Sequence, residues 1–268
     1  MNPSFVDSHL HLQDDRFGMN AACIIETAAK AGVAMLLCNA AQESDWEAIL
    51  NLHRPHDAVI PFFGVHPWYI DKATDGWDAR LKKQLESCNG SGVGESGLDK
   101  TCASDFSRQI NAFEKHLEIA LHLVRPIAVH CVRSWGTLIE ILETRAKHNQ
   151  LPATMIHSFN GSEETMKRLT RIGCFLSFSL QVTSPHNKKL LQTMNRTPLD
   201  RLLLETDAPA RLSPSALSHT GSLPPFSEPA MIPEFYRWAA LQRNSDPLHF
   251  KTQIWHNAQI YTNRTARW

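Results

Sequence analysis

The chain has 268 residues, of which 43% are hydrophobic and 20% charged, a balance typical of a globular protein and unlike a disordered or fibrous one. Its 27 Lys and Arg residues equal its 27 Asp and Glu residues, which excludes a strongly basic nucleic-acid coat or a polybasic membrane binder. Nucleic acid stays open as a substrate, because a metal ion can supply positive charge locally.

Sequence features that place a protein in the cell point to the cytoplasm. No apolar run reaches the length of about 18 residues that a membrane span needs. The first residues lack the basic and apolar regions of a secretory signal, and the six cysteines are scattered without a CxxC pair. We therefore expect a cytoplasmic protein without a membrane partner. The unusual feature of the composition is its 14 histidines.

Short apolar runs of strand length alternate with segments of helical spacing along the chain. The predicted strands are 5–12, 34–40, 59–65, 91–98, 127–132, 153–159, 174–180 and 202–208. The predicted helices are 20–31, 44–53, 77–88, 106–123, 135–148, 163–172, 186–194, 230–243 and 247–262. A Pro- and Ser-rich connection, 209–233, is either a functional loop or surface filler.

This alternation predicts one α/β domain over residues 1–268. Eight strand–helix repeats in this length match a TIM-like (β/α)₈ barrel, whose active site lies at the C-terminal ends of the strands. A doubly wound open sheet is the rival fold. It should show a glycine-rich phosphate turn after an early strand, and no GxGxxG or GxxxxGK[ST] motif is present.

Polar residues that can bind metal recur at the ends of the predicted strands. Asp7, His9 and His11 alternate along the first strand and therefore share one face. Five later strands finish with an acid or a histidine: His66, Glu95, His130, His157 and Asp207. Buried polar groups of this kind are costly unless they are paired or bound to metal. Their shared position indicates an active site.

The candidate ligands are all nitrogen or oxygen donors: His9, His11, Glu95, His130, His157 and Asp207. They are too many for one tetrahedral ion and suit two divalent ions that share a carboxylate. Glu95 lies between the histidine groups in strand order, where it could bridge. His66 is surplus to this count and free to bind substrate. The donor types do not choose among Mg²⁺, Mn²⁺ and Zn²⁺.

Five segments together resemble the signature blocks of the TatD family, which are metal-dependent deoxyribonucleases of the amidohydrolase superfamily. The segments occur in the family's order and cover nearly the whole chain. They are 5–11 (FVDSHLH), 64–67 (GVHP), 92–99 (GVGESGLD), 157–161 (HSFNG) and 203–209 (LLETDAP). The resemblance implies a TIM-like barrel with a metal centre.

The resemblance also implies a division of the ligands. One metal would be held by His9, His11, Glu95 and Asp207, and the second by Glu95, His130 and His157. His66 resembles a residue near the scissile phosphate. The chain departs from the family pattern at Val132, where an arginine is usual and Arg133 follows, at Asn160 and at Ser227. None of these departures falls on a metal ligand. We therefore expect them to affect substrate contacts and the reaction rate.

The function we expect is hydrolysis of phosphodiester bonds in DNA, with Asp207, Glu95 and His66 as catalytic residues. Two divalent ions would lower the pKa of a water molecule and neutralise charge on the phosphate. Asp207 would orient that water and accept its proton. The family resemblance favours removal of nucleotides in the 3′→5′ direction.

Further residues are expected around the metals and the substrate. Lys100 and Arg133 follow strand ends and could hold phosphate oxygens together with His66. Trp68 could stack on a base. Asp7 and Glu205 could orient the metal ligands by contacting them on the side away from the metal. We expect a monomer with no obligate protein partner.

Two alternatives remain. The same centre could hydrolyse an ester, lactone, amide or phosphoester that is not nucleic acid, because fold and metal do not fix the substrate. The chain could also be a metal-stabilised binding protein without catalysis, which would bind ligands and leave them intact.

Overall fold

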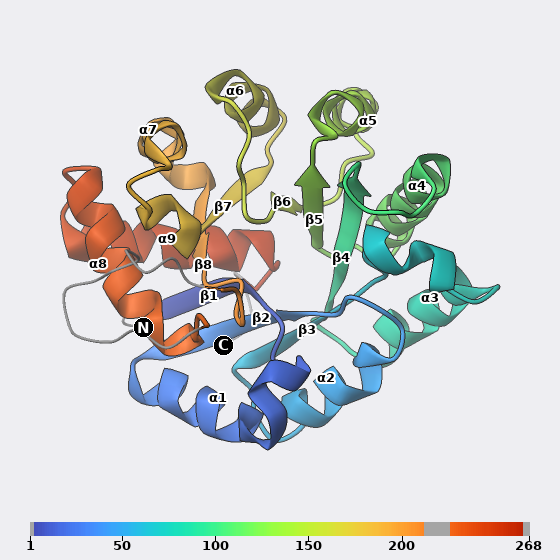
Figure 1. Cartoon of the computed structure of the whole chain (residues 1–268), viewed down its shortest axis with the longest axis horizontal. Helices are drawn as coiled ribbons and strands as arrows, with labels where there is room; N and C mark the ends of the chain where they lie inside the picture. Colours follow the sequence, from blue (N-terminus) through green and yellow to red (C-terminus); the bar gives the residue numbers. More distant parts are fainter. Residues whose placement is uncertain (1–2, 212–225, 265–268) are drawn as a thin grey trace.

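A computed structural model describes residues 3–211 and 226–264 of the chain. Eight parallel strands form one sheet in chain order (Figure 1). They are β1 (Phe5–Leu10), β2 (Val33–Asn39), β3 (Val59–Phe63), β4 (Gly92–Asp99), β5 (Ile127–Val132), β6 (Thr154–Ile156), β7 (Phe175–Ser179) and β8 (Leu202–Glu205). This order confirms the predicted TIM-like barrel.

The barrel closes just beyond the end of β8. The backbone N–H of Asp207 donates to the carbonyl of His9 (3.0 Å), and that of His11 donates to the carbonyl of Ala208 (2.7 Å). These two bonds join the first strand to the segment after the last one. They therefore fix Asp207 beside the two histidines of the first predicted strand.

Helices surround the strands, as Figure 1 shows. They are α1 (Ala21–Lys30), α2 (Asp45–His53), α3 (Trp77–Ser87), α4 (Phe106–His122), α5 (Trp135–Lys147), α6 (Glu163–Arg171), α7 (Lys188–Arg196), α8 (Ile232–Gln242) and α9 (Pro247–Tyr261). Five 3₁₀ helices join them: η1 (Asp15–Asn20), η2 (Pro67–Lys72), η3 (Leu180–Thr183), η4 (Leu199–Arg201) and η5 (Pro229–Met231). None of the described helices is long and apolar enough to cross a membrane.

Aromatic side chains join α9 to the strands of the barrel. Tyr261 of α9 stacks on Phe62 of β3 with ring centroids 6.0 Å apart, and its centroid lies 5.9 Å from that of Phe175 of β7. Strands β3 and β7 lie on opposite sides of an eight-stranded barrel, so the tyrosine connects the two sides.

Six of the predicted strands end one to three residues earlier than expected, and the two largest differences, at β6 and β8, occur where the chain turns at the site. Strand β1 ends at Leu10, β6 at Ile156 and β8 at Glu205. Ser158 and Asp207 adopt left-handed backbone conformations, with φ of 40° and 52°, which no strand can continue. Of the predicted connection 209–233, residues 212–225 lie outside the described part of the chain.

Candidate metal centre

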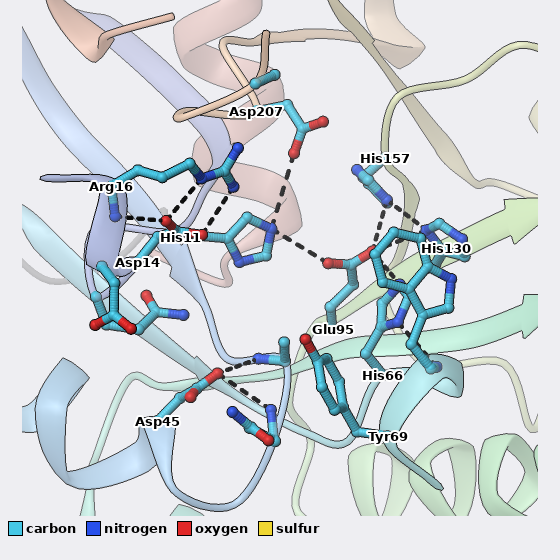
Figure 2. A pocket seen from close by; sticks show the side chains of 16 residues that line it. His11, Asp14, Arg16, Asp45, His66, Tyr69, Glu95, His130, His157 and Asp207 are labelled. Atoms are coloured by element: carbon cyan, nitrogen blue, oxygen red, sulfur yellow. Dashed lines mark hydrogen bonds and ion pairs between the residues drawn. The ribbon is translucent and has the colours of Figure 1, made fainter. Parts of the chain in front are cut away.

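All six predicted ligands converge at the carboxyl-terminal mouth of the barrel. They line or adjoin a cavity of about 440 Å³, and Figure 2 shows five of them together with His66. His9 and Glu95 lie within β1 and β4, and His130 lies within β5. His157 directly follows β6, and Asp207 lies two residues beyond β8.

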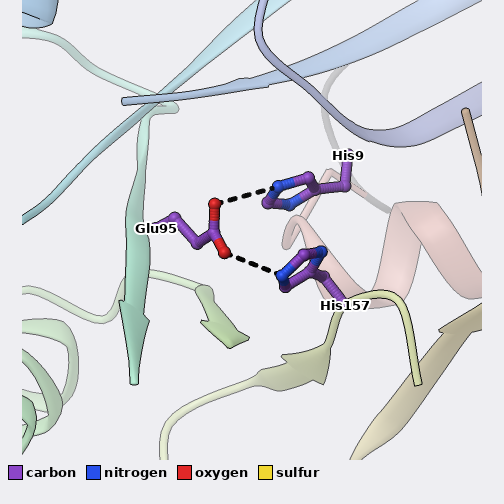
Figure 3. Close-up of side chains that lie close together, drawn as sticks. All are labelled: His9, Glu95 and His157. Carbon is purple, nitrogen blue, oxygen red and sulfur yellow. Dashed lines mark ion pairs between the residues drawn. The ribbon is translucent and has the colours of Figure 1, made fainter. Parts of the chain in front are cut away.

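Glu95 stands at the centre of the cluster, with a side chain only 4% exposed. Its Oε2 lies 3.3 Å from Nε2 of His9 and 3.4 Å from Nε2 of His11. Its Oε1 lies 2.7 Å from Nε2 of His157 and 3.0 Å from Nδ1 of His130. Figure 3 shows the carboxylate between His9 and His157. Each oxygen thus serves a different pair of histidines, which is the arrangement of a bridging ligand.

The spacing of the first ligand group fits a small divalent ion. Nε2 of His9 and Nε2 of His11 are 3.3 Å apart, and Oδ1 of Asp207 lies 3.9 and 3.8 Å from them. Ligand atoms about 2.0–2.1 Å from a tetrahedral zinc ion lie roughly 3.3–3.4 Å apart. Nδ1 of His11 donates to the carbonyl of Asn39 (2.8 Å), so the lone pair of the neutral ring is at Nε2, facing the other ligands.

The second ligand group is supported by carboxylates behind its histidines. Nδ1 of His130 lies 3.1 Å from Nε2 of His157, and both face Oε1 of Glu95. On the far side of each ring, Asp99 Oδ2 lies 3.2 Å from Nε2 of His130 and Glu205 Oε1 lies 3.5 Å from Nδ1 of His157. A carboxylate behind an imidazole orients the ring and raises its basicity toward a metal.

The electrostatics of the cluster favour a cation. Burial opposes ionisation of Glu95, yet the imidazoles of His157, His66 and His9 hold its pKa well below the usual range. Burial likewise opposes the charged form of His11, but Glu95 and Asp207 raise its pKa to about 9. The buried carboxylates therefore stabilise positive charge at this place. Divalent ions could supply it in place of protons.

His66 follows β3 and faces the same centre. Its Nδ1 accepts a hydrogen bond from the backbone N–H of Trp68 (3.1 Å), so its proton is on Nε2, which lies 3.3 Å from Oε1 of Glu95. Burial lowers the pKa of His66 to about 4, which keeps the ring neutral. His66 therefore presents one N–H donor to the cavity.

Asp7 and Glu205 lie behind the ligands. Asp7 accepts hydrogen bonds from the backbone N–H (2.9 Å) and hydroxyl of Thr206, the residue before Asp207. Burial raises the pKa of Asp7 to about 8. Glu205 accepts from the backbone N–H of Ser158 (2.7 Å) and faces His157, as described above. Asp7 thus joins β1 to the segment after β8, and Glu205 contacts a ligand directly.

Of the three further residues predicted to contact the substrate, one lines the cavity in the described part of the chain and two do not. Trp68 lines the cavity and is 55% exposed. Lys100 and Arg133 are exposed and are not among the described residues that line it. The ammonium of Lys100 lies over the ring of Phe106, 4.7 Å from its centroid. The departures from the family pattern, Val132, Asn160 and Ser227, are also absent from the described lining.

Sequence reasoning missed three residues of the site. Asp99 lies four residues after Glu95 on β4, and this spacing on one strand could have identified it. Arg16 and Tyr69 line the cavity from η1 and η2, two short helices without an apolar period. Arg16 donates to Asp14 through Nε and Nη2 (both 2.8 Å) and to the carbonyl of Pro209 through Nη1 (2.7 Å).

Comparisons with known proteins identify metal-dependent relatives of this chain. The family model "TatD related DNase" matches residues 6–262. The 3'-5' ssDNA/RNA exonuclease TatD of Erwinia tasmaniensis is 28% identical over 96% of this chain and 99% of its own. The "uncharacterized metal-dependent hydrolase YjjV" of Escherichia coli K12 is 29% identical over 76% of this chain and 79% of its own.

Solved structures show the same fold. The crystal structure of the Escherichia coli YjjV protein superimposes with a TM-score of 0.87 and 25% identity, covering 98% of this chain and 99% of that one. A TatD-family hydrolase from Entamoeba histolytica gives a TM-score of 0.85 at 20% identity, over 99% of this chain and all of that one (100%). The fold and the ligand cluster are those of a metal-dependent hydrolase, and the family model and the relatives indicate one that acts on ester bonds. The chain belongs to the TatD-related DNase family, which confirms the resemblance seen in its sequence.

Proposed function

We propose that this protein is a divalent-metal-dependent nuclease that removes nucleotides from the 3′ end of DNA. The observation that carries the proposal is Glu95, whose two oxygens face separate groups of histidines in an open cavity. Relatives named 3'-5' ssDNA/RNA exonuclease support the nucleic-acid substrate and the direction.

The two groups of side chains fit two ions. His9, His11, Glu95 and Asp207 would hold one, and Glu95, His130 and His157 the other, with Mg²⁺, Mn²⁺ or Zn²⁺ as candidates. When bound, the ions would supply positive charge to the phosphate and acidify a water molecule. Two ions explain the donor count better than one, because a single tetrahedral ion would use only four of the six candidate ligands.

The chain's own residues supply the proton transfer and the orientation. Asp207 is partly exposed at the cavity, and burial raises the pKa of its carboxyl to about 6, close to the value that suits a base at neutral pH. It would orient the attacking water and accept its proton. The neutral His66 would donate its Nε2–H to a phosphate oxygen.

A second candidate function rests on the charge of the cavity. Arg16 is the only lysine or arginine among the described residues that line it, and its guanidinium is already paired with Asp14. Asp15 and Asp45 lie on the same wall. A long polyanion is poorly matched to such a wall. The same centre could therefore hydrolyse a small ester, lactone, amide or phosphoester, as the relative named only as a metal-dependent hydrolase allows.

The test is cleavage of 5′-end-labelled oligonucleotides, single- and double-stranded, by metal-loaded protein, with products resolved by length. The nuclease predicts a ladder that shortens from the 3′ end. Small phosphodiesters, carboxylic esters and lactones are assayed in parallel. Turnover of these small substrates, while the oligonucleotides stay intact, would support the second function. Intact substrates throughout, across Mg²⁺, Mn²⁺ and Zn²⁺, would select a binding protein.

We further propose that the protein works in the cytoplasm as a monomer. The six cysteines, all of them free thiols, support a reducing compartment, and a cluster assembled entirely from one chain supports the monomer. Sedimentation of the metal-loaded protein tests the second point.

A further inference from the structure

Trp68 is an exposed aromatic side chain at the mouth of the metal centre. Leu241 and Leu248, two other large apolar side chains that are strongly exposed, lie on the outer helices α8 and α9. Trp68 instead lines the cavity of the candidate centre, with 55% of its surface open. Exposed indole surface has a hydrophobic cost that a ligand could remove by covering it.

The indole is held in place although it is exposed. Its Nε1–H donates to Oδ2 of Asp99 (2.7 Å), a carboxylate that is itself buried and also accepts from the backbone N–H of Thr101 (2.7 Å). The backbone N–H of Trp68 donates to His66, whose ring lies edge-on to the indole with centroids 5.0 Å apart. A ring fixed at its edge in this way loses little conformational freedom when a ligand covers its open surface.

The same carboxylate oxygen positions the indole relative to the metal ligands. Oδ2 of Asp99 accepts from Trp68 and lies 3.2 Å from Nε2 of His130, whose Nδ1 faces Glu95 at 3.0 Å. Three consecutive contacts therefore connect the indole to the bridging carboxylate. The position of the ring relative to the bridging carboxylate is thus set by side chains that are largely buried.

We propose that Trp68 is the platform on which a nucleobase next to the scissile phosphate stacks. Stacking on an aromatic ring tolerates every base, because each base has a π-face. A base inside a duplex has both faces covered by its neighbours, whereas an unpaired 3′ end leaves the faces of its bases free to stack on the indole. The inference rests on the proposed nuclease function and assigns the residue that contacts the base beside the reacting phosphate.

The experiment compares the native protein with Trp68→Ala on four single-stranded oligonucleotides. One is unmodified, and the others carry an abasic site at the last, the second-last or the sixth nucleotide from the 3′ end. On the unmodified strand, Trp68→Ala should lower kcat/KM for the first cleavage by roughly tenfold to hundredfold, the range for one base–aromatic stack. An abasic site at one of the two terminal positions should remove this difference, and the distant abasic site should not.

This design separates stacking from damage to the metal centre. Trp68→Ala also removes a donor from Asp99, but any resulting change at His130 affects all four substrates by the same factor and cancels in their ratios. Trp68→Phe keeps an aromatic face without the N–H. It should therefore retain most of the difference in kcat/KM between the unmodified strand and the strands with a terminal abasic site. Leu241→Ala, which shortens an exposed side chain on α8, should behave as the native protein does.

The outcomes are distinct. An equal loss on all four substrates would show that Trp68 acts only through Asp99 and His130, and would overturn the platform. Unchanged kcat/KM in Trp68→Ala would overturn it as well. Intact oligonucleotides with the native, metal-loaded protein would instead overturn the proposed function, and this inference with it.

Discussion

Asp207 has two proposed roles, metal ligand and general base, that a single substitution can separate. Its carboxylate faces His9 and His11, and its backbone adopts a left-handed conformation with φ of 52°. Asparagine tolerates that conformation and keeps a carbonyl oxygen for a metal, but it cannot accept a proton. We predict that Asp207→Asn folds normally, retains much of its metal and loses at least about 10²-fold in kcat, with a smaller change in KM.

Steady-state kinetics with elemental analysis of the same sample checks this prediction. Normal kcat in a fully metallated Asp207→Asn protein would remove Asp207 as the base. Loss of metal in proportion to activity would leave it as a ligand only.

His116 of α4 is a buried histidine outside the metal centre. Its Nδ1 donates to the carbonyl of Ala112 (2.7 Å), and its Nε2 accepts from the backbone N–H of Val65 (3.1 Å), the residue before His66. Burial lowers its pKa to about 4, below the ordinary value of 6.5. The unfolded chain therefore binds one more proton between these two pH values, and the stability that neutral His116 contributes is lost as the pH falls through them.

We predict that the free energy of unfolding of the native protein falls more steeply from pH 6.5 to pH 4 than that of His116→Gln. The difference in slope should approach about 1.4 kcal/mol per pH unit, the value for one proton. Urea unfolding at several pH values measures it. The titrating ligands are common to both proteins, so parallel slopes would show that His116 is not held neutral by the fold.

At the scale of elements, sequence periodicity was sufficient to predict the strands and helices. Strand β5 has the predicted bounds, and the others differ mainly where residues turn into the site, as at Ser158 and Asp207. The convergence of the candidate metal ligands could be predicted because alternation along a strand and the shared end of parallel strands are local rules. The positions of Arg16 and Tyr69 could not be predicted, because η1 and η2 carry no apolar period. The placement of these two helices depends on packing against distant strands.

The close approach of β4 and β5 depends on Gly97. It pairs with His130 in the strand register and has φ of 147°, and a Cβ atom there would lie 2.0 Å from the carbonyl oxygen of His130. We predict that Gly97→Ala lowers the free energy of unfolding by about 2–5 kcal/mol and weakens metal binding, because His130 must move. Thermal unfolding and bound metal are the measurements.

Gly136 in α5 is the matched control for this change. A Cβ atom there meets nothing within 4 Å. Gly136→Ala should leave metal binding unchanged and stabilise the protein by up to about 1 kcal/mol, since alanine is the better helix former. Equal effects of the two substitutions would contradict the close approach at Gly97.

For the whole molecule, barrel closure and metal binding are linked. The ligands come from β1, β4, β5 and the segments after β6 and β8, so an unfolded chain has no such site and metal should bind the folded state alone. The central claim is that this mouth holds two ions, joined by Glu95, and that both are needed for hydrolysis.

The most direct measurement is a titration of metal-free protein with Mn²⁺ or Zn²⁺, in which bound ions per chain and cleavage of an end-labelled single strand are followed in the same samples. We predict that cleavage stays near background up to one bound ion, rises as the second binds and reaches its maximum at two. Glu95→Ala should bind neither ion tightly. Full cleavage at one bound ion, or in protein whose metal removal is verified, would contradict the account.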